Sequence, residues 1–97
     1  MQTTSTNLFT HPGFTRTAQE TLGRATDAVA NYKGAANEAA RAGDEFAARI
    51  LFSARAIAAQ ALTTIEAVWT GACTDPQWVW VAVDLLDDAA ERAAEAS

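Results

Sequence analysis

Hydrophobic residues and alanines recur every three or four positions through most of the chain. Over residues 15–42 the spacing alternates between four and three, which is typical of a coiled-coil seam, and polar residues occupy the opposite side. The pattern predicts one long amphipathic helix. Its expected inner residues are Ala18, Leu22, Ala25, Val29, Tyr32, Ala36 and Ala39.

A second periodic stretch, residues 44–70, begins directly after Gly43. Glycine readily takes the left-handed conformation that ends a helix, and the side chain of Asp44 can accept a hydrogen bond at the start of the next helix. We therefore expect the chain to reverse direction here. The expected inner residues of this second helix are Phe46, Ala47, Ile50, Leu51, Ala54, Ile57, Ala58, Ala61, Leu62, Ile65, Val68 and Trp69.

A third periodic stretch, residues 75–96, follows a short connection that contains Gly71. Asp75 stands directly before Pro76, an order typical of a helix start, because aspartate caps the helix and proline fits its first turn. The pattern predicts a third helix. Its expected inner residues are Trp78, Val79, Ala82, Leu85, Leu86, Ala89, Ala90 and Ala93.

Two short connections force neighbouring helices to run antiparallel. The 97 residues suffice for one domain. The sequence therefore predicts an all-α fold, an antiparallel up-down-up three-helix bundle with alanine-rich, coiled-coil-like seams, formed by residues 14–97. Residues 1–13 are polar apart from Leu8 and Phe9 and end in a helix-breaking His-Pro-Gly run, and we interpret them as a mobile N-terminal tail.

Composition makes the expected core thin. Hydrophobic residues make up 49% of the chain, but alanine is the most frequent of them. Each buried alanine methyl group contributes only about 0.8 kcal/mol. Such a domain depends on helix propensity and close helix packing, or on a partner surface. The alanine-rich, lysine-poor composition is also typical of a GC-rich bacterial genome.

Charge is distributed unevenly along the chain. The formal net charge is −5, and residues 75–97 hold six acidic residues against the single basic Arg92, whereas the rest of the chain is balanced. Binding to a nucleic-acid backbone or an anionic membrane requires clustered basic residues, so neither is an expected partner. The acidic residues of the third helix form an outer stripe of Asp84, Asp87, Asp88, Glu91 and Glu95. Such a stripe is typical of a solvated face; the alternative is a phosphate mimic that inhibits a DNA- or RNA-handling protein.

Residues that support catalysis are scarce. His11 is the only histidine and Cys73 the only cysteine, so neither a base with its orienting partner nor an internal disulfide is expected. Metal-ligand spacings and glycine-rich phosphate loops do not occur. We expect no enzymatic activity, no cofactor and no metal. The absence of a long apolar stretch and of a secretory signal pattern favours a cytoplasmic location.

The tryptophans point to a contact surface. All three lie between residues 69 and 80, and chain reversal is expected to bring them to one end of the bundle. Trp69 and Trp78 are expected to fill that end. Trp80 and Val81 fall instead on the acidic side of the third helix, where we predict that they contact a partner; the alternative is that the N-terminal tail covers Trp80.

Phe52 projects from the far side of the second helix, close to Ala56, Ala59 and Thr63. It either faces the third helix or borders a small-residue surface suited to dimerisation. Together these features predict a non-catalytic interaction module, a small regulatory or accessory subunit that docks on another protein or on a second copy of itself. The predicted partner-binding residues are Trp69, Trp78, Trp80, Val81 and Phe52.

One short motif adds a further alternative. Trp69-Thr70-Gly71 lies at a predicted helix–helix turn and, with the chain length, resembles the WXG family of small type VII secreted proteins. The resemblance implies a secreted two-helix hairpin with this turn near its middle. Here a further helix is predicted before the turn, and the family's Tyr-x-x-x-Asp/Glu export signal is missing after the second helix: Trp80 to Asp84 has the spacing but lacks the tyrosine.

Overall fold

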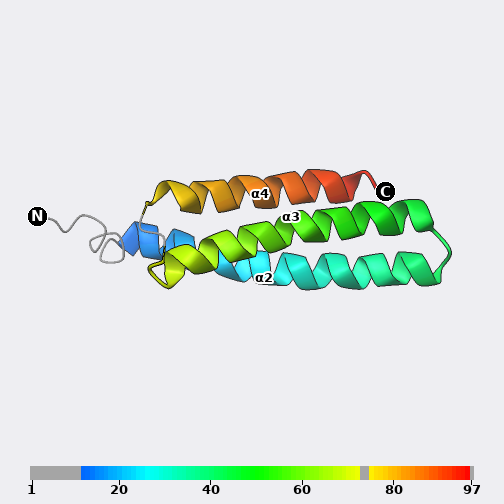
Figure 1. Cartoon of the computed structure of the whole chain (residues 1–97), viewed down its shortest axis with the longest axis horizontal. Helices are drawn as coiled ribbons and strands as arrows, with labels where there is room; N and C mark the ends of the chain where they lie inside the picture. Colours follow the sequence, from blue (N-terminus) through cyan, green and yellow to red (C-terminus); the bar gives the residue numbers. More distant parts are fainter. Residues whose placement is uncertain (1–11, 73–74, 97) are drawn as a thin grey trace, which may run out of the picture.

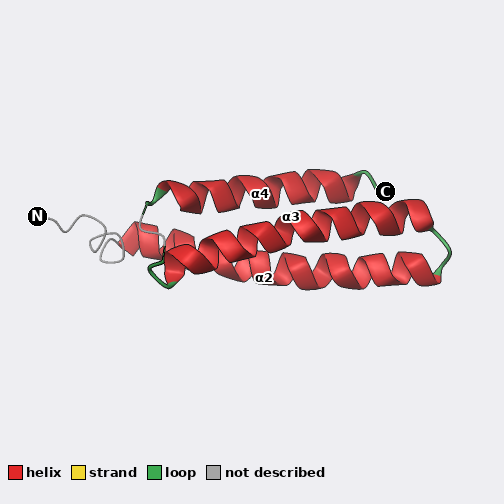
Figure 2. Ribbon diagram, in the orientation of Figure 1, coloured by secondary structure: helices red, strands yellow, loops and turns green. Residues whose placement is uncertain are grey.

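The computed structural model describes residues 12–72 and 75–96. This part of the chain consists of helices and the turns between them, without strands (Figure 2). The helices are α2 (Pro12–Arg41), α3 (Glu45–Trp69) and α4 (Gln77–Ala94) (Figure 1). The predicted all-α three-helix fold is confirmed.

α3 occupies the middle of the bundle. It packs along both other helices, whereas α2 and α4 contact each other over a shorter stretch. α3 runs antiparallel to both neighbours, so the start of α2, the end of α3 and the start of α4 lie at the same end of the molecule (Figure 1). The up-down-up order predicted from the short connections is therefore correct.

Backbone hydrogen bonds close the turn between α2 and α3. The N–H of Gly43 donates to the Ala40 carbonyl at 3.1 Å and the N–H of Asp44 to the Ala39 carbonyl at 2.9 Å, the pattern of a Schellman motif. Gly43 has a φ of 82°, which residues with a Cβ rarely adopt. Asp44 Oδ1 then accepts a hydrogen bond from the Ala47 N–H at 3.0 Å. The predicted helix stop and helix start are both confirmed.

The Trp-x-Gly turn of residues 69–71 begins the second connection, and Gly71 has a φ of 85°. At the far end, Asp75 Oδ1 accepts a hydrogen bond from the Gln77 N–H at 2.9 Å. Asp75 therefore accepts an N–H at the start of α4 as predicted, but the N-cap residue is Pro76, one position later than the sequence pattern placed it. The Trp-x-Gly turn follows the second of the three described helices, which differs from the two-helix hairpin of the WXG family.

The first helix begins earlier than predicted. α2 starts at Pro12, whereas the sequence pattern placed the start near residue 15. Proline fits the first turn of a helix, where its missing N–H would have no partner in any case, so the Pro-Gly pair does not act as a breaker here. The rest of the predicted tail, including His11, lies outside the described residues, as does Cys73.

The core is built mainly from alanine. Half-buried residues such as Leu22, Val29 and Tyr32 pack around it. Its largest fully buried side chains are Ile65, Val68 and Val79, so the helices approach closely and the core has little depth. One buried cluster joins all three helices and contains Ala18, Ala25, Ala58, Ala61, Ile65, Val68, Val79, Ala82, Leu86 and Ala89.

Four residues assigned to inner faces are exposed instead: Phe46 is 70% exposed, and Trp69, Trp78 and Ala90 are also exposed. For Phe46 the cause is the length of α4. Arg92, near the end of α4, donates a hydrogen bond to the Ser53 hydroxyl. Phe46 precedes Ser53 by two turns and so lies beyond the last turn of α4. Periodicity identifies one side of a helix, but not how far the neighbouring helix extends along it.

Candidate protein-interaction surface

The bulkiest side chains of the described chain are on its surface. Trp69, Trp78 and Trp80 are 39%, 45% and 57% exposed, and Phe52 is 41% exposed. The alanine seams bring the helix backbones too close together to leave room for an indole ring between them. Aromatic rings contribute the most on burial, so exposed ones mark a candidate contact surface.

A groove runs between α3 and α4 beside Trp78. We call it the Trp78 groove; it has a volume of about 500 Å³ and is lined by Ala59, Gln60, Thr63, Thr64, Trp78, Val81 and Leu85. An adjoining hollow of about 300 Å³ is lined by Thr63, Thr64, Ala67 and Trp78. The Trp78 side chain therefore forms a wall that both spaces share.

Small residues on α3 create this groove, because no bulky α3 side chain stands opposite Val81 and Leu85. The hydroxyl groups of Thr63 and Thr64 donate hydrogen bonds to backbone carbonyls one turn earlier, at 3.1 and 2.8 Å. Their polar groups are thereby satisfied within α3. The α3 side of the groove presents mainly apolar atoms, and it suits an apolar side chain.

Phe52 extends the α3 side of the groove. It belongs to a stripe with Ala56, Ala59 and Thr63, because the spacings of four, three and four residues place them on one side of a helix. Ala59 and Thr63 line the groove, and the exposed Ala56 and Phe52 continue the stripe toward the start of α3. The structure thus places Phe52 on the small-residue surface and not in the core.

Trp80 and Val81 lie on different sides of α4, which corrects their interpretation as one patch. Val81 is half-buried and lines the Trp78 groove. Trp80 is exposed and shares its side of the helix with Asp84, Asp87 and Glu91, at spacings of four, three and four residues. Successive helical residues point about 100° apart around the helix axis, so a partner helix that packs on Val81 in the groove does not also pack on Trp80.

Trp69 does not line the groove either. It follows Leu62, which packs against the core, by two turns of α3, and it is the least exposed of the three tryptophans. Chain reversal therefore brings the tryptophans to one end of the molecule, as predicted, but not to one face. Of the predicted partner-binding residues, Trp78 and Val81 meet in the groove and Phe52 extends it.

The five acidic residues of the outer stripe are not equivalent. Asp87 pairs with Arg24 of α2 at 2.8 Å, and Glu95 pairs with Arg92 at 2.8 Å. Within the described part of the chain, the other three form no ion pair; they are Asp84, Asp88 and Glu91. All five are exposed, so the two ion pairs contribute little to stability and leave three carboxylates for other contacts.

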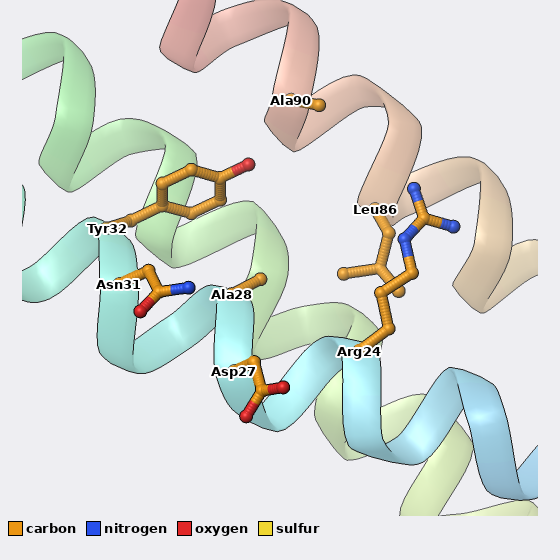
Figure 3. Close-up of a pocket in the computed structure, with 7 residues that line it drawn as sticks. All are labelled: Arg24, Asp27, Ala28, Asn31, Tyr32, Leu86 and Ala90. Atoms are coloured by element: carbon orange, nitrogen blue, oxygen red, sulfur yellow. The ribbon is translucent and has the colours of Figure 1, made fainter.

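A separate pocket, not predicted from the sequence, lies between α2 and α4 and has a volume of about 300 Å³. Figure 3 shows Arg24 reaching toward α4 beside Leu86, with Tyr32 at the other end of the pocket. Its signal in the sequence is the pair of small residues Ala28 and Ala90, which leave α2 and α4 without side chains to fill the space between them. The lining residues are Arg24, Asp27, Ala28, Asn31, Tyr32, Leu86 and Ala90.

The described residues form no metal-holding cluster and no helix that could span a membrane. Among residues 12–72 and 75–96, no group of three or more His, Cys, Asp and Glu side chains is placed to hold a metal ion. None of the three described helices has the length and apolarity needed to cross a membrane.

No family model matches the chain, and neither the curated proteins nor the solved structures yield a match.

Proposed function

We propose that this protein is a non-catalytic helical interaction module, a small regulatory or accessory subunit that binds another protein, or a second copy of itself, through the Trp78 groove. The observation that carries the proposal is the distribution of side-chain size. Alanine fills most of the interior, whereas the tryptophans and Phe52 are on the surface. A small domain loses stability by leaving its best apolar side chains in water, and a partner that covers them recovers it.

The groove offers enough apolar surface to anchor a helix. Covering the exposed 45% of Trp78 removes roughly 100 Å² from water, which is worth on the order of 2 kcal/mol. Val81 and Leu85 extend the same apolar wall along α4. A central tryptophan surrounded by smaller contacts is the typical composition of an interface hot spot.

The direction of the groove favours a helical partner segment. α3 and α4 run side by side (Figure 1). The residues that line the groove extend from Ala59 to Thr64 on α3 and from Trp78 to Leu85 on α4, so the groove is elongated along both helices. An amphipathic helix laid into such a space contacts it through residues spaced three or four apart. The partner helix would pack on α3 and α4 much as a further helix of the bundle would.

The acidic stripe supports a second function, inhibition of a nucleic-acid-handling protein by mimicry of phosphates. Asp84, Asp88 and Glu91 are exposed and free of ion pairs within the described residues, and they are available to a basic surface. Trp80 stands on the same side of α4 and adds an apolar contact there. This function predicts binding that weakens steeply with salt and does not depend on Trp78.

Site-specific photocrosslinking tests the interaction proposal. A photoreactive phenylalanine analogue is placed at Thr63, in the groove, and in a matched variant at Ala30, an exposed position on α2. After irradiation in the native cells, the expected result is a discrete covalent adduct from position 63 and none from position 30. The adduct mass tells a second copy from a different protein. Equal labelling from both positions, or none from position 63, would contradict the proposal.

A further inference from the structure

We infer that the occupant of the Trp78 groove is an amphipathic helix of a different protein, with lysine or arginine residues beside its apolar anchors. The inference rests on the proposed function, because it names the partner of the same groove. It is carried by the charge along the two sides of the groove.

The α4 side of the groove is acidic at its solvent edge. Asp84 follows Val81 by three residues, and Asp88 follows Leu85 by three residues. Residues three apart are neighbours on a helix surface, so each aspartate lies next to a residue that lines the groove. Both are exposed, and neither forms an ion pair within the described residues.

No basic residue on the groove neutralises these carboxylates. The residues that α3 contributes to the groove are alanine, glutamine and threonine. Arg92, the basic residue of α4, pairs with Glu95 at 2.8 Å and also donates to the Ser53 hydroxyl. A helix in the groove therefore meets apolar atoms at its centre and negative charge along one edge, which basic residues complement.

The same charges argue against a second copy as the occupant. A two-fold symmetric dimer through the groove uses the same surface patch of both subunits, so Asp84 and Asp88 of both copies border one interface. Residues 75–97 carry six acidic residues and one basic residue, and the remainder of the chain is balanced. A second copy carries a net charge of −5, so its approach to this acidic edge is opposed by repulsion between the two copies as a whole.

Selection from a displayed library of 18-residue helical peptides, performed on the full-length protein, tests the inference. One side of each peptide carries randomised apolar residues and the flanking positions are fully randomised. The expected winners have apolar anchors at i, i+4 and i+7 with lysine or arginine on one flank. Isothermal titration with the best synthetic peptide then gives the affinities of the variants below.

Charge reversal at the groove edge is the first readout. We expect Asp84→Lys with Asp88→Lys to weaken binding about tenfold, because two exposed ion pairs are lost and replaced by repulsion. The matched control, Glu20→Lys with Glu38→Lys, makes the same change in net charge on the exposed side of α2. It should alter the affinity less than about twofold, because the charges lie away from the groove.

A pair of substitutions at Thr63 is the second readout. Thr63 is exposed and lines the groove, so a longer side chain there obstructs the occupant without entering the core. Thr63→Lys and Thr63→Glu obstruct it to a similar extent but with opposite charge. The lysine variant should lose several-fold more affinity than the glutamate variant, with unchanged helicity by circular dichroism in both.

The outcomes separate this inference from the proposed function. Winners with neutral or acidic flanks that are still blocked at Thr63 would overturn the basic partner and leave the groove as a binding site. If light scattering detects a dimer and either Thr63 substitution dissociates it, the basic partner is also overturned, and the groove is still a binding site. Selection of no helical peptide, or binding unaffected at Thr63, would overturn both. Equal losses in the edge variant and its α2 control would overturn the inferred contact with Asp84 and Asp88.

Discussion

The two sides of α3 are built from similar small residues and have opposite properties. On the core side, Ala58 and Ala61 are fully buried within the cluster that joins the helices. On the groove side, Ala59 and Thr63 line an open space beside Trp78. The difference lies in what stands across from them. On the core side, small residues of α3 face small residues of the neighbouring helices, and the backbones pack closely together. On the groove side, small residues of α3 lie opposite the indole ring of Trp78 on α4, and the space beside the ring stays open.

The largest effect should come from removing a bulky side chain from the core side of α3. Ile65 is among the largest fully buried side chains, so Ile65→Ala should cost about 3 kcal/mol of unfolding free energy. Phe46→Ala removes a larger side chain from the same helix, but Phe46 is 70% exposed and the cost should stay below about 1 kcal/mol. Urea unfolding followed by circular dichroism measures both. Equal costs would show that exposed rings also hold the fold together.

Enlarging a small residue should have opposite consequences on the two sides. Ala58→Leu forces extra carbon atoms into a closed seam and should cost about 2 kcal/mol. Thr63→Leu adds similar bulk to the groove and improves helix propensity, so stability should stay the same or rise by about 0.5 kcal/mol. The same unfolding experiment decides it. A destabilising Thr63→Leu would mean that the groove is as tightly packed as the seam.

The caps of the two connections allow a finer comparison. Asp44→Ala should cost about 1 kcal/mol, because the Asp44 carboxylate accepts the Ala47 N–H in a partly buried setting. Asp75→Ala should cost about half as much, because the hydrogen bond from the Gln77 N–H is exposed to water. Asp44→Asn retains the acceptor and is the control. Thermal unfolding of the three variants gives the order; a larger loss at Asp75 would place the weaker connection between α2 and α3.

The smallest effect is expected where α2 meets α4. The Arg24–Asp87 pair has side chains that are 49% and 60% exposed, and its coupling energy should be about 0.5 kcal/mol or less. A double-mutant cycle with Arg24→Ala and Asp87→Ala measures it. The coupling should vanish in about 0.5 M salt because exposed charges are screened. A coupling that persists at that salt concentration would indicate that α2 and α4 close over the pair in solution.

The three helices and their up-down-up order could be predicted from the sequence. A glycine followed by an aspartate between two helical stretches predicts the end of one helix and the start of the next. Gly43 and Asp44 form the hydrogen bonds expected for these two roles. The seam positions of α2 follow from spacing alone, and Ala18, Ala25 and Ala36 are fully buried. The start of α2 was misjudged because proline both breaks helices and begins them, and only the three-dimensional context decides between these roles.

The candidate site was only partly predictable. Trp78 was assigned to the inner face, which gives the correct side of α4 but not the open space beside it. Val81 was grouped with Trp80, although the rotation between successive helical residues places Val81 in the groove and Trp80 outside it. A groove depends on how two helices are rotated and shifted relative to each other, and this depends on contacts between segments distant in sequence. The periodicity of a single helix contains no information about that setting.

The position of the three tryptophans on the surface determines what their fluorescence reports. Indole emission shifts when a ring moves between water and an apolar environment. Unfolding transfers these rings from partly wet to fully wet surroundings, so their emission should change only modestly as the bundle melts. An occupant of the Trp78 groove excludes water from one of the rings, and its arrival should shift the spectrum to the blue. The intrinsic fluorescence of this protein is therefore a reporter of binding and a poor gauge of folding.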